Sequence, residues 1–160
     1  MATSPKNKKE LTEELERRIQ KALRNDVNRD IRKCVQKHVE KDVFSTYTPR
    51  EYKRRTSIGL DADRNIVGTV DGTTLTVQNV TKIAPPIVKG HTPSDDPEHG
   101  LTELVESGAY NLFRLPDNGR PFLHPRPFMT NAKNEVYDEG SRVHKDILND
   151  IANQFPKVND

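Results

Sequence analysis

The pattern of hydrophobic positions predicts one long helix near the start of the chain. Apolar residues recur there at a strict spacing of four: Leu11, Leu15, Ile19, Leu23, Val27, Ile31, Val35, Val39 and Val43. Ala22 and Cys34 fill the neighbouring face, and no proline or glycine interrupts the run. Because residues at this spacing share one side of a helix, we expect a helix from about Lys8 to Val43.

The spacing of four has a geometric consequence for this helix. Four residues of an α-helix turn through about 400°, so the stripe drifts by roughly 40° per step and winds around the axis. Its two ends should therefore be buried against different neighbours. A helix of about 36 residues would also be roughly 54 Å long, more than a compact domain of this size needs. We expect it to project from the body or to break near Asn25 and Asp26.

The period changes to two between Asn65 and Ile83, where apolar residues alternate with threonine and other polar residues. The Asp71-Gly72 pair between the two runs favours a hairpin turn, since glycine tolerates positive φ. This region predicts a β-hairpin with one buried face.

Further elements follow the hairpin. Residues 84–100, "APPIVKGHTPSDDPEHG", are rich in proline and acidic residues and are expected to form an exposed loop. "LTELVESG" is typical of a short helix closed by Gly108. A last helix is expected from about Thr130 to Phe155, capped by Thr130 or Asn131, with Gly140 marking a close contact or a kink.

These elements predict an α+β fold with a long N-terminal helix, a small antiparallel sheet built on the hairpin, a C-terminal helix and long loops or arms. We expect a single domain over residues 1–160 with a flexible tail at residues 1–8. Only 32% of the residues are hydrophobic and 31% are charged, so the core should be thin. Some packing partners are therefore expected in other subunits.

Bulk features narrow the setting. The single cysteine, Cys34, cannot form an internal disulfide, and its place beside the apolar stripe suggests a small core residue. No apolar run approaches the roughly 18 residues that span a membrane. The polar start of the sequence lacks the pattern of a signal peptide, so we expect a protein made in a reducing cytosol.

The net charge of +2 conceals a basic stretch of the first helix. The stretch from position 17 to 37 contains eight basic and two acidic residues, so its net charge is eight minus two, or +6. The basic residues are Arg17, Arg18, Lys21, Arg24, Arg29, Arg32, Lys33 and Lys37, and the acids are Asp26 and Asp30. This surface could face DNA or an acidic partner. It could equally be a solvated helix face.

Residues with catalytic or metal-binding chemistry form no familiar pattern. The long loop carries two histidines and three acids, but their spacing matches no zinc motif: His91, His99, Asp95, Asp96 and Glu98. The sequence contains no nucleophile elbow and no phosphate-binding glycine loop. We therefore expect neither an enzyme nor a cofactor or metal site.

Two segments place aromatic residues beside arginines and prolines. The segment from Asp42 to Arg55 contributes Tyr47, Pro49, Tyr52, Arg54 and Arg55, and the segment "RPFLHPRPF" contributes Arg120, Phe122, Arg126, Pro127 and Phe128. Proline-stiffened aromatic and arginine anchors suit a protein interface. The alternative is that Phe122 and Phe128 cap the hairpin of the chain itself.

Taken in order, these segments resemble a known family. A helix leading into "DVFSTYTPREYKRR", then "NIVGTVDGTTLTVQNVT", "LTELVESG" and an Arg-Pro-Phe before a C-terminal helix resemble the tail-completion, or head-to-tail joining, proteins of long-tailed bacteriophages, the HK97 gp10-like group. The similarity runs from about Leu11 to Ile151. The family pattern falls on Asp42, Val43, Phe44, Tyr47, Pro49, Tyr52, Arg54, Arg55, Arg126, Pro127 and Phe128.

The resemblance implies a structural protein of the virion neck, assembled in the host cytoplasm. Its expected partners are other copies of itself in a ring, expected as a hexamer, a tail terminator or tail tube protein, and a head-completion protein of the stopper or adaptor type. DNA would pass through the ring without sequence-specific binding, and no membrane is involved. A nucleic-acid-binding module using the basic helix and an assembly chaperone stay as alternatives.

Overall fold

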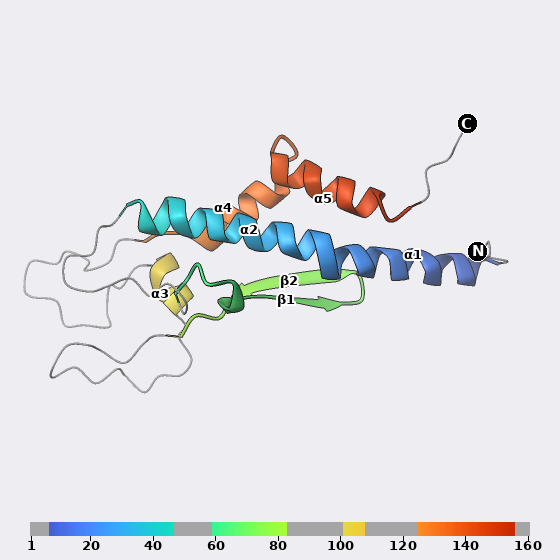
Figure 1. Ribbon diagram of the computed structural model, residues 1–160, viewed down its shortest axis with the longest axis horizontal. Helices are drawn as coiled ribbons and strands as arrows, with labels where there is room; N and C mark the ends of the chain where they lie inside the picture. The colour runs from blue at the N-terminus through green and yellow to red at the C-terminus, as the bar shows by residue number, and fades with distance from the viewer. Residues whose placement is uncertain (1–6, 47–58, 83–100, 108–124, 156–160) are drawn as a thin grey trace, which may run out of the picture. The chain divides into compact units, whose positions relative to one another are not determined.

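The computed structural model describes residues 7–46, 59–82, 101–107 and 125–155 (Figure 1). Within these ranges the fold is α+β, as the sequence predicts: a long N-terminal helix is followed by a two-stranded antiparallel sheet and, later, by C-terminal helices. A 3₁₀ turn, η3 (Asp63–Asn65), leads into the hairpin.

The long helix is continuous but changes type three times along its length. It consists of α1 (Lys8–Ala22), the π-helical η1 (Leu23–Val27), α2 (Asn28–His38) and the π-helical η2 (Val39–Phe44). Asn7 caps its start, because the Asn7 side chain accepts a hydrogen bond from the Glu10 backbone N–H at 2.9 Å. The helix does not break at Asn25 and Asp26, which was one of the two expectations; these residues lie in the π-helical η1.

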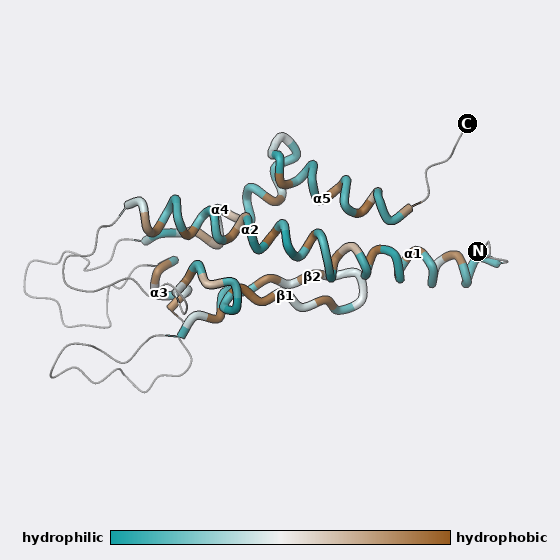
Figure 2. Tube along the Cα trace, viewed as in Figure 1, coloured by the Kyte–Doolittle hydropathy of each residue, from teal (hydrophilic) through white to brown (hydrophobic). Residues whose placement is uncertain are grey.

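The two π-helical segments fit the spacing of four. A π-helical turn closes on the fifth residue, so each residue turns the helix by less than it would in an α-helix. Four residues then come closer to one whole turn, and the drift of the apolar stripe slows. Leu23 and Val27 bound η1, Val39 and Val43 lie in η2, and all four are buried. Figure 2 shows hydrophobic positions recurring along this helix among hydrophilic ones.

The hairpin pairs β1 (Ile66–Asp71) with β2 (Thr74–Asn79). Its turn residues are Gly72 and Thr73, one position later than the Asp71-Gly72 pair expected, and Gly72 has φ 54°. A residue with a side chain rarely adopts this φ, which explains the glycine. Burial alternates along both strands, so the predicted single buried face is confirmed.

The chain forms two compact units. Unit 1 takes Met1–Cys34, Gly68–Val77 and Asn134–Asp160, and unit 2 takes Val35–Val67 and Gln78–Lys133. Each unit draws on segments far apart in the sequence, and the long helix contributes to both. Successive parts of the apolar stripe therefore belong to different units.

Unit 1 has a core built around the end of α1 and η1. Ala22, Leu23 and Val27 are buried there, and partly buried side chains from the helix, the hairpin and α5 (Arg142–Ala152) pack against them: Ile19, Ile31, Val70, Leu75, Ile147 and Ile151. Asn28 also packs against Gly68 of β1: a Cβ added to Gly68 would lie 2.1 Å from the Asn28 Oδ1. Glycine is therefore needed at position 68 for this close approach.

Unit 2 has a core of its own. Its buried apolar residues come from the second half of the long helix, the hairpin region, α3 (Leu101–Ser107) and α4 (Phe128–Tyr137): Val35, Val39, Val43, Leu60, Ala62, Ile66, Val105, Phe128 and Ala132. Two buried polar residues, Asn79 and Thr81, are hydrogen-bonded there. Asn79 Nδ2 donates to the Leu60 carbonyl at 2.7 Å, and the Thr81 backbone N–H donates to Asn79 Oδ1 at 3.1 Å.

The C-terminal region contains two helices, so the prediction of one helix from Thr130 to Phe155 is wrong. The chain leaves α4 after Tyr137 and begins α5 at Arg142. Between them, Asp138 Oδ1 accepts from the Gly140 N–H at 2.9 Å, and Ser141 caps α5 by accepting from the His144 N–H at 3.0 Å. These local hydrogen bonds replace helical ones, and Gly140 lies at the break.

Candidate functional site

The Arg-Pro-Phe sequence predicted as an interface anchor lies in unit 2, at the start of α4. The Arg126 backbone N–H donates to the Val105 carbonyl at 2.9 Å, and Phe128 is fully buried, with 0% of its surface exposed. The Phe128 side chain is therefore buried within its own chain, whereas the neighbouring Pro127 is exposed. The alternative that Phe122 and Phe128 cap the hairpin stays a prediction, because Phe122 lies outside the described residues.

The remaining predicted interface anchors lie outside the described residues. These are Tyr47, Pro49, Tyr52, Arg54, Arg55, Arg120 and Phe122. The expected loop at residues 84–100 and the helix-closing Gly108 lie outside them as well. Their roles stay predictions.

The start of α4 is capped from another helix. The carboxylate of Glu106, on α3, accepts hydrogen bonds from the Met129 backbone N–H and from the Thr130 hydroxyl, the latter at 2.9 Å. The expected caps, Thr130 and Asn131, therefore have other roles. A negative charge at a helix N-terminus is favourable, because the first backbone N–H groups lack partners within the helix.

A partly buried polar cluster that the sequence did not indicate joins the long helix to α4 within unit 2. His38 Nδ1 lies 2.8 Å from Asp42 Oδ2, and the Asn131 amide donates to the same oxygen at 2.9 Å. Burial alone would raise the pKa of Asp42, but the hydrogen bonds from Asn131 and His38 outweigh it and leave the pKa lowered. His38 and Asp42 are four apart on a helix, which was the available signal.

The basic face of the long helix is partly neutralised by carboxylates. Arg17 and Arg18 both bind Glu14, with nitrogen–oxygen distances of 2.8 and 2.6 Å. The hydrogen bond from Arg17, followed by that from Arg18, lowers the pKa of Glu14 to about 2. Arg18 also donates to the Gln154 carbonyl at 2.9 Å, which links α1 to the segment after α5 within unit 1.

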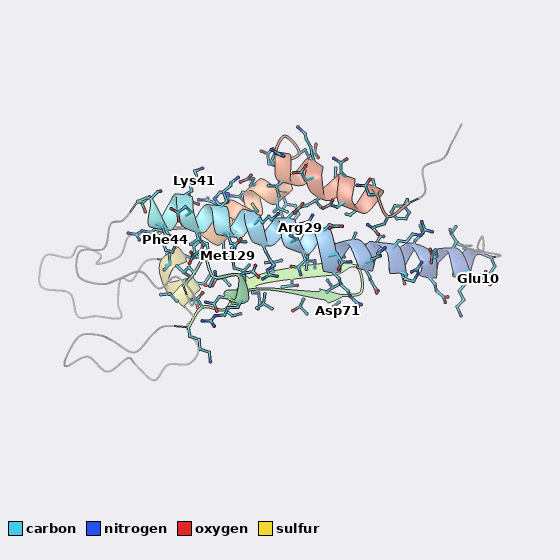
Figure 3. The ribbon with its side chains drawn as sticks, in the orientation of Figure 1. Glu10, Arg29, Lys41, Phe44, Asp71 and Met129 are labelled. Atoms are coloured by element: carbon cyan, nitrogen blue, oxygen red, sulfur yellow. The ribbon has the colours of Figure 1, made fainter. Side chains whose placement is uncertain are left out.

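A second neutralised site follows on the same helix. Arg29 binds Asp26 at 2.8 Å and Asp30 at 3.0 Å, and its position on α2 is labelled in Figure 3. Asp150 of α5 belongs to this neighbourhood. Burial, then the charges of Asp30 and Asp26, raise the pKa of Asp150, and its Oδ2 is buried without a hydrogen-bond partner. The ionised form of Asp150 is therefore less favourable in the folded chain than in the unfolded chain.

Four other residues of the predicted basic stretch are exposed: Lys21, Arg24, Lys33 and Lys37. Arg32 is half-buried. The predicted basic surface therefore divides into arginines held by carboxylates and a set of exposed, mostly lysine side chains. Exposed ion pairs contribute only about 0–1 kcal/mol, so even the paired arginines can exchange partners.

Large apolar side chains are also exposed in the described part of the chain: Leu11, Leu15, Val67, Val80, Tyr137 and Leu148. Leu11 and Leu15 are the first two positions of the apolar stripe, whose later positions are buried or partly buried. Cys34, in contrast, is buried, as expected for a small core residue. Among the described helices, none is both long and apolar enough to cross a bilayer.

Comparison with known proteins adds one finding. No curated protein and no solved structure matches the chain. The model of the YomN family matches residues 7–151, which include every described helix and strand except Ala152, the last residue of α5. The chain therefore belongs to the YomN family, a phage-derived family of proteins.

Proposed function

We propose that the protein is a structural component of the phage neck that forms a ring joining the tail tube to the head connector around the DNA path. Two findings support this proposal: the membership of a phage-derived family and the order of motifs that resembles tail-completion proteins. The order of long helix, hairpin, short helix and C-terminal helices agrees with that resemblance.

The observation that carries the proposal is the uncovered start of the apolar stripe. Leu11 and Leu15 are exposed on α1, while Leu23, Val27, Val35, Val39 and Val43 are buried. Removing apolar surface from water is worth roughly 25 cal/mol per Å². A neighbouring subunit or neck protein that covers these two leucines would gain this free energy, as expected for a chain that completes its packing in an assembly.

The proposed partners are further copies of the chain, a tail terminator or tail tube protein, and a head-completion protein. DNA would pass through the centre of the ring. Four exposed basic residues suit contact with phosphates or with an acidic partner: Lys21, Arg24, Lys33 and Lys37. They supply positive charge without the fixed hydrogen-bond geometry that recognition of a base sequence needs.

A nucleic-acid-binding module is the second candidate, favoured by the same exposed basic residues. It is weakened by the carboxylates that hold Arg17, Arg18 and Arg29. Salt separates the two functions. A DNA-binding module should lose affinity for duplex steeply between low and moderate salt, whereas ring contacts between apolar surfaces should persist.

A joining assay tests the main proposal. Filled heads and complete tails from particles grown without the protein are mixed with the purified chain, and joined particles are counted by electron microscopy. We expect joining with the wild-type chain and a loss of joining with Leu11→Glu/Leu15→Glu. Thr12→Glu is the matched control, since Thr12 is exposed on the same helix. Equal joining by both variants would contradict the role given to the stripe.

A further inference from the structure

The hairpin exposes a surface that is unusual for this chain. In unit 1 its outward-facing residues are Thr69, Asp71, Thr74 and Thr76, all of them exposed. Neither strand contains lysine, arginine, glutamate or proline, although 31% of the whole chain is charged. Exposed strands in soluble proteins are usually protected by lysine or proline against pairing with other strands. This hairpin lacks that protection.

The register of the hairpin determines which backbone groups point outwards. A two-residue turn joins Asp71 to Thr74, and the Val80 N–H donates to the Asn65 carbonyl at 2.7 Å. Asp71, Thr69 and Val67 therefore pair through hydrogen bonds within the hairpin. The backbone groups between them point away from the partner strand: those of Gly68 and Val70 on β1, and of Leu75 and Val77 on β2.

Each of these two edges can accept another strand. The described part of the sheet has two strands, so both edges lack a sheet partner there. The far end of β2 is already used, because the Asn79 carbonyl accepts from the Thr102 hydroxyl at 2.9 Å. The available stretch runs from Thr74 to Val77 on β2 and from Gly68 to Asp71 on β1. An extended strand is the partner that such backbone groups bind.

We propose that the partner is a second copy of this chain, with β1 of one copy pairing antiparallel to β2 of the next. This inference rests on the proposed ring of copies. The alignment that each hairpin already makes internally can be repeated between chains, with Thr69 opposite Thr76 and Val70 opposite Leu75. Asp71 then meets Thr74, so no like charges face one another. Because two different edges meet, the contact is head-to-tail and can close into a ring.

The width of the hairpin suits such repetition. Two strands occupy about 10 Å at a spacing of roughly 4.8 Å. This is also about the diameter of one helix. In unit 1 the long helix packs on the inner face of the hairpin, through Leu23, Val70 and Leu75. Copies placed side by side at the hairpin spacing would each have room for this helix, and Asp71 would lie at the tip of each hairpin (Figure 3).

Cysteine cross-linking tests this arrangement in the full chain. Thr69→Cys and Thr76→Cys are purified separately, mixed at high protein concentration and oxidised, and products are resolved on a non-reducing gel. Opposed residues of antiparallel strands have Cα atoms about 4.5–5.5 Å apart, within the range of a disulfide. The wild-type chain is the blank, since Cys34 is 2% exposed. Equal melting temperatures of the reduced variants show that both fold.

We expect disulfide-linked dimers from the mixture and none from either variant alone. Dimers from one variant alone in equal amount would indicate β1–β1 or β2–β2 pairing and overturn the proposal, and so would a mixture that gives no dimers. These results are distinguishable from a failure of the joining role. Joined particles made without the protein would remove that role, whereas cross-links between copies would still stand.

Discussion

At the scale of single residues, the structure shows which aromatic side chains are buried and which are exposed, and the sequence alone could not distinguish them. Phe128 and the exposed Tyr137 lie on the same helix, and both are aromatic. The sequence placed Phe128 beside Arg126 and Pro127, a composition that suits an interface. Burial depends on contacts between segments far apart in the chain, such as α3 with the start of α4, and no local pattern reports these contacts.

Replacing Phe128 tests its role in the core. We expect Phe128→Ala to lower the free energy of unfolding by about 3–5 kcal/mol, because a large cavity replaces a fully buried ring. Tyr137→Ala, on the same helix but 72% exposed, should change it by less than about 0.5 kcal/mol. Urea unfolding of the two variants measures both values. If both substitutions changed the free energy of unfolding equally little, Phe128 would not be a core residue and the interface hypothesis would be favoured again.

Two aspartates predict opposite dependences on pH. The raised pKa of Asp150 means that the folded state holds its proton more tightly than the unfolded state does. Protonation of Asp150 therefore stabilises the fold below pH 3.8, and this stabilisation is lost as pH rises from 3.8 through the raised folded value. The lowered pKa of Asp42 gives stabilisation that is present above 3.8 and is lost as pH falls through the folded value.

Amide substitutions separate the two aspartates. Asp150→Asn should raise stability at pH 7, since it removes a partly buried negative charge near Asp30 and Asp26, and Asp42→Asn should lower it. The measurement is urea unfolding at pH 7 and at pH 4. If Asp150→Asn destabilised the protein at pH 7, the carboxylate would have a favourable partner and its assignment as unfavourable in the folded chain would be wrong.

At the scale of elements, the sequence predicted what local periodicity encodes. The long helix and the hairpin were predicted because their periods of four and two are regular over many residues. The division between α4 and α5 was missed, although Ser141 was available as a helix cap and Gly140 marked the place. The composition of the helix does not indicate the π-helical segments. The strict spacing of four between apolar positions is the sequence feature that agrees with them.

The contact between the long helix and β1 predicts a coupled pair of substitutions. Gly68→Ala should destabilise the protein by about 1–3 kcal/mol, because the new Cβ would overlap the Asn28 side chain. Asn28→Ala should relieve most of this cost when combined with Gly68→Ala. A double-mutant cycle by urea unfolding measures the coupling. Additive effects would show that the two residues do not meet.

The cap of α4 predicts a second effect at this scale. Glu106→Ala should lower the free energy of unfolding by about 1 kcal/mol, since the Met129 N–H and the Thr130 hydroxyl lose their acceptor. Glu103→Ala is the matched control, because Glu103 is an exposed acid on the same short helix. Thermal unfolding compares the pair. An equal loss in both variants would point to net charge instead of capping.

At the scale of the whole molecule, a thin core is expected from the composition, and among the described residues the buried apolar set of each unit is small. Membership of a phage-derived family narrows the biological setting. The sequence indicated basic and aromatic candidates for contact but not the hairpin edges, since an edge can be identified only when strand pairing is known. The predicted anchors from Tyr47 to Arg55 stay predictions.

The central claim is that this chain joins heads to tails, and electron microscopy of particles produced without it is the most direct test. Cells infected with phage lacking the gene are lysed, and the particles are imaged beside those from a complemented infection. We predict heads filled with DNA and tails of normal length that remain separate, with joined particles restored by the wild-type gene. Joined, infectious particles in normal number without the protein would contradict the account.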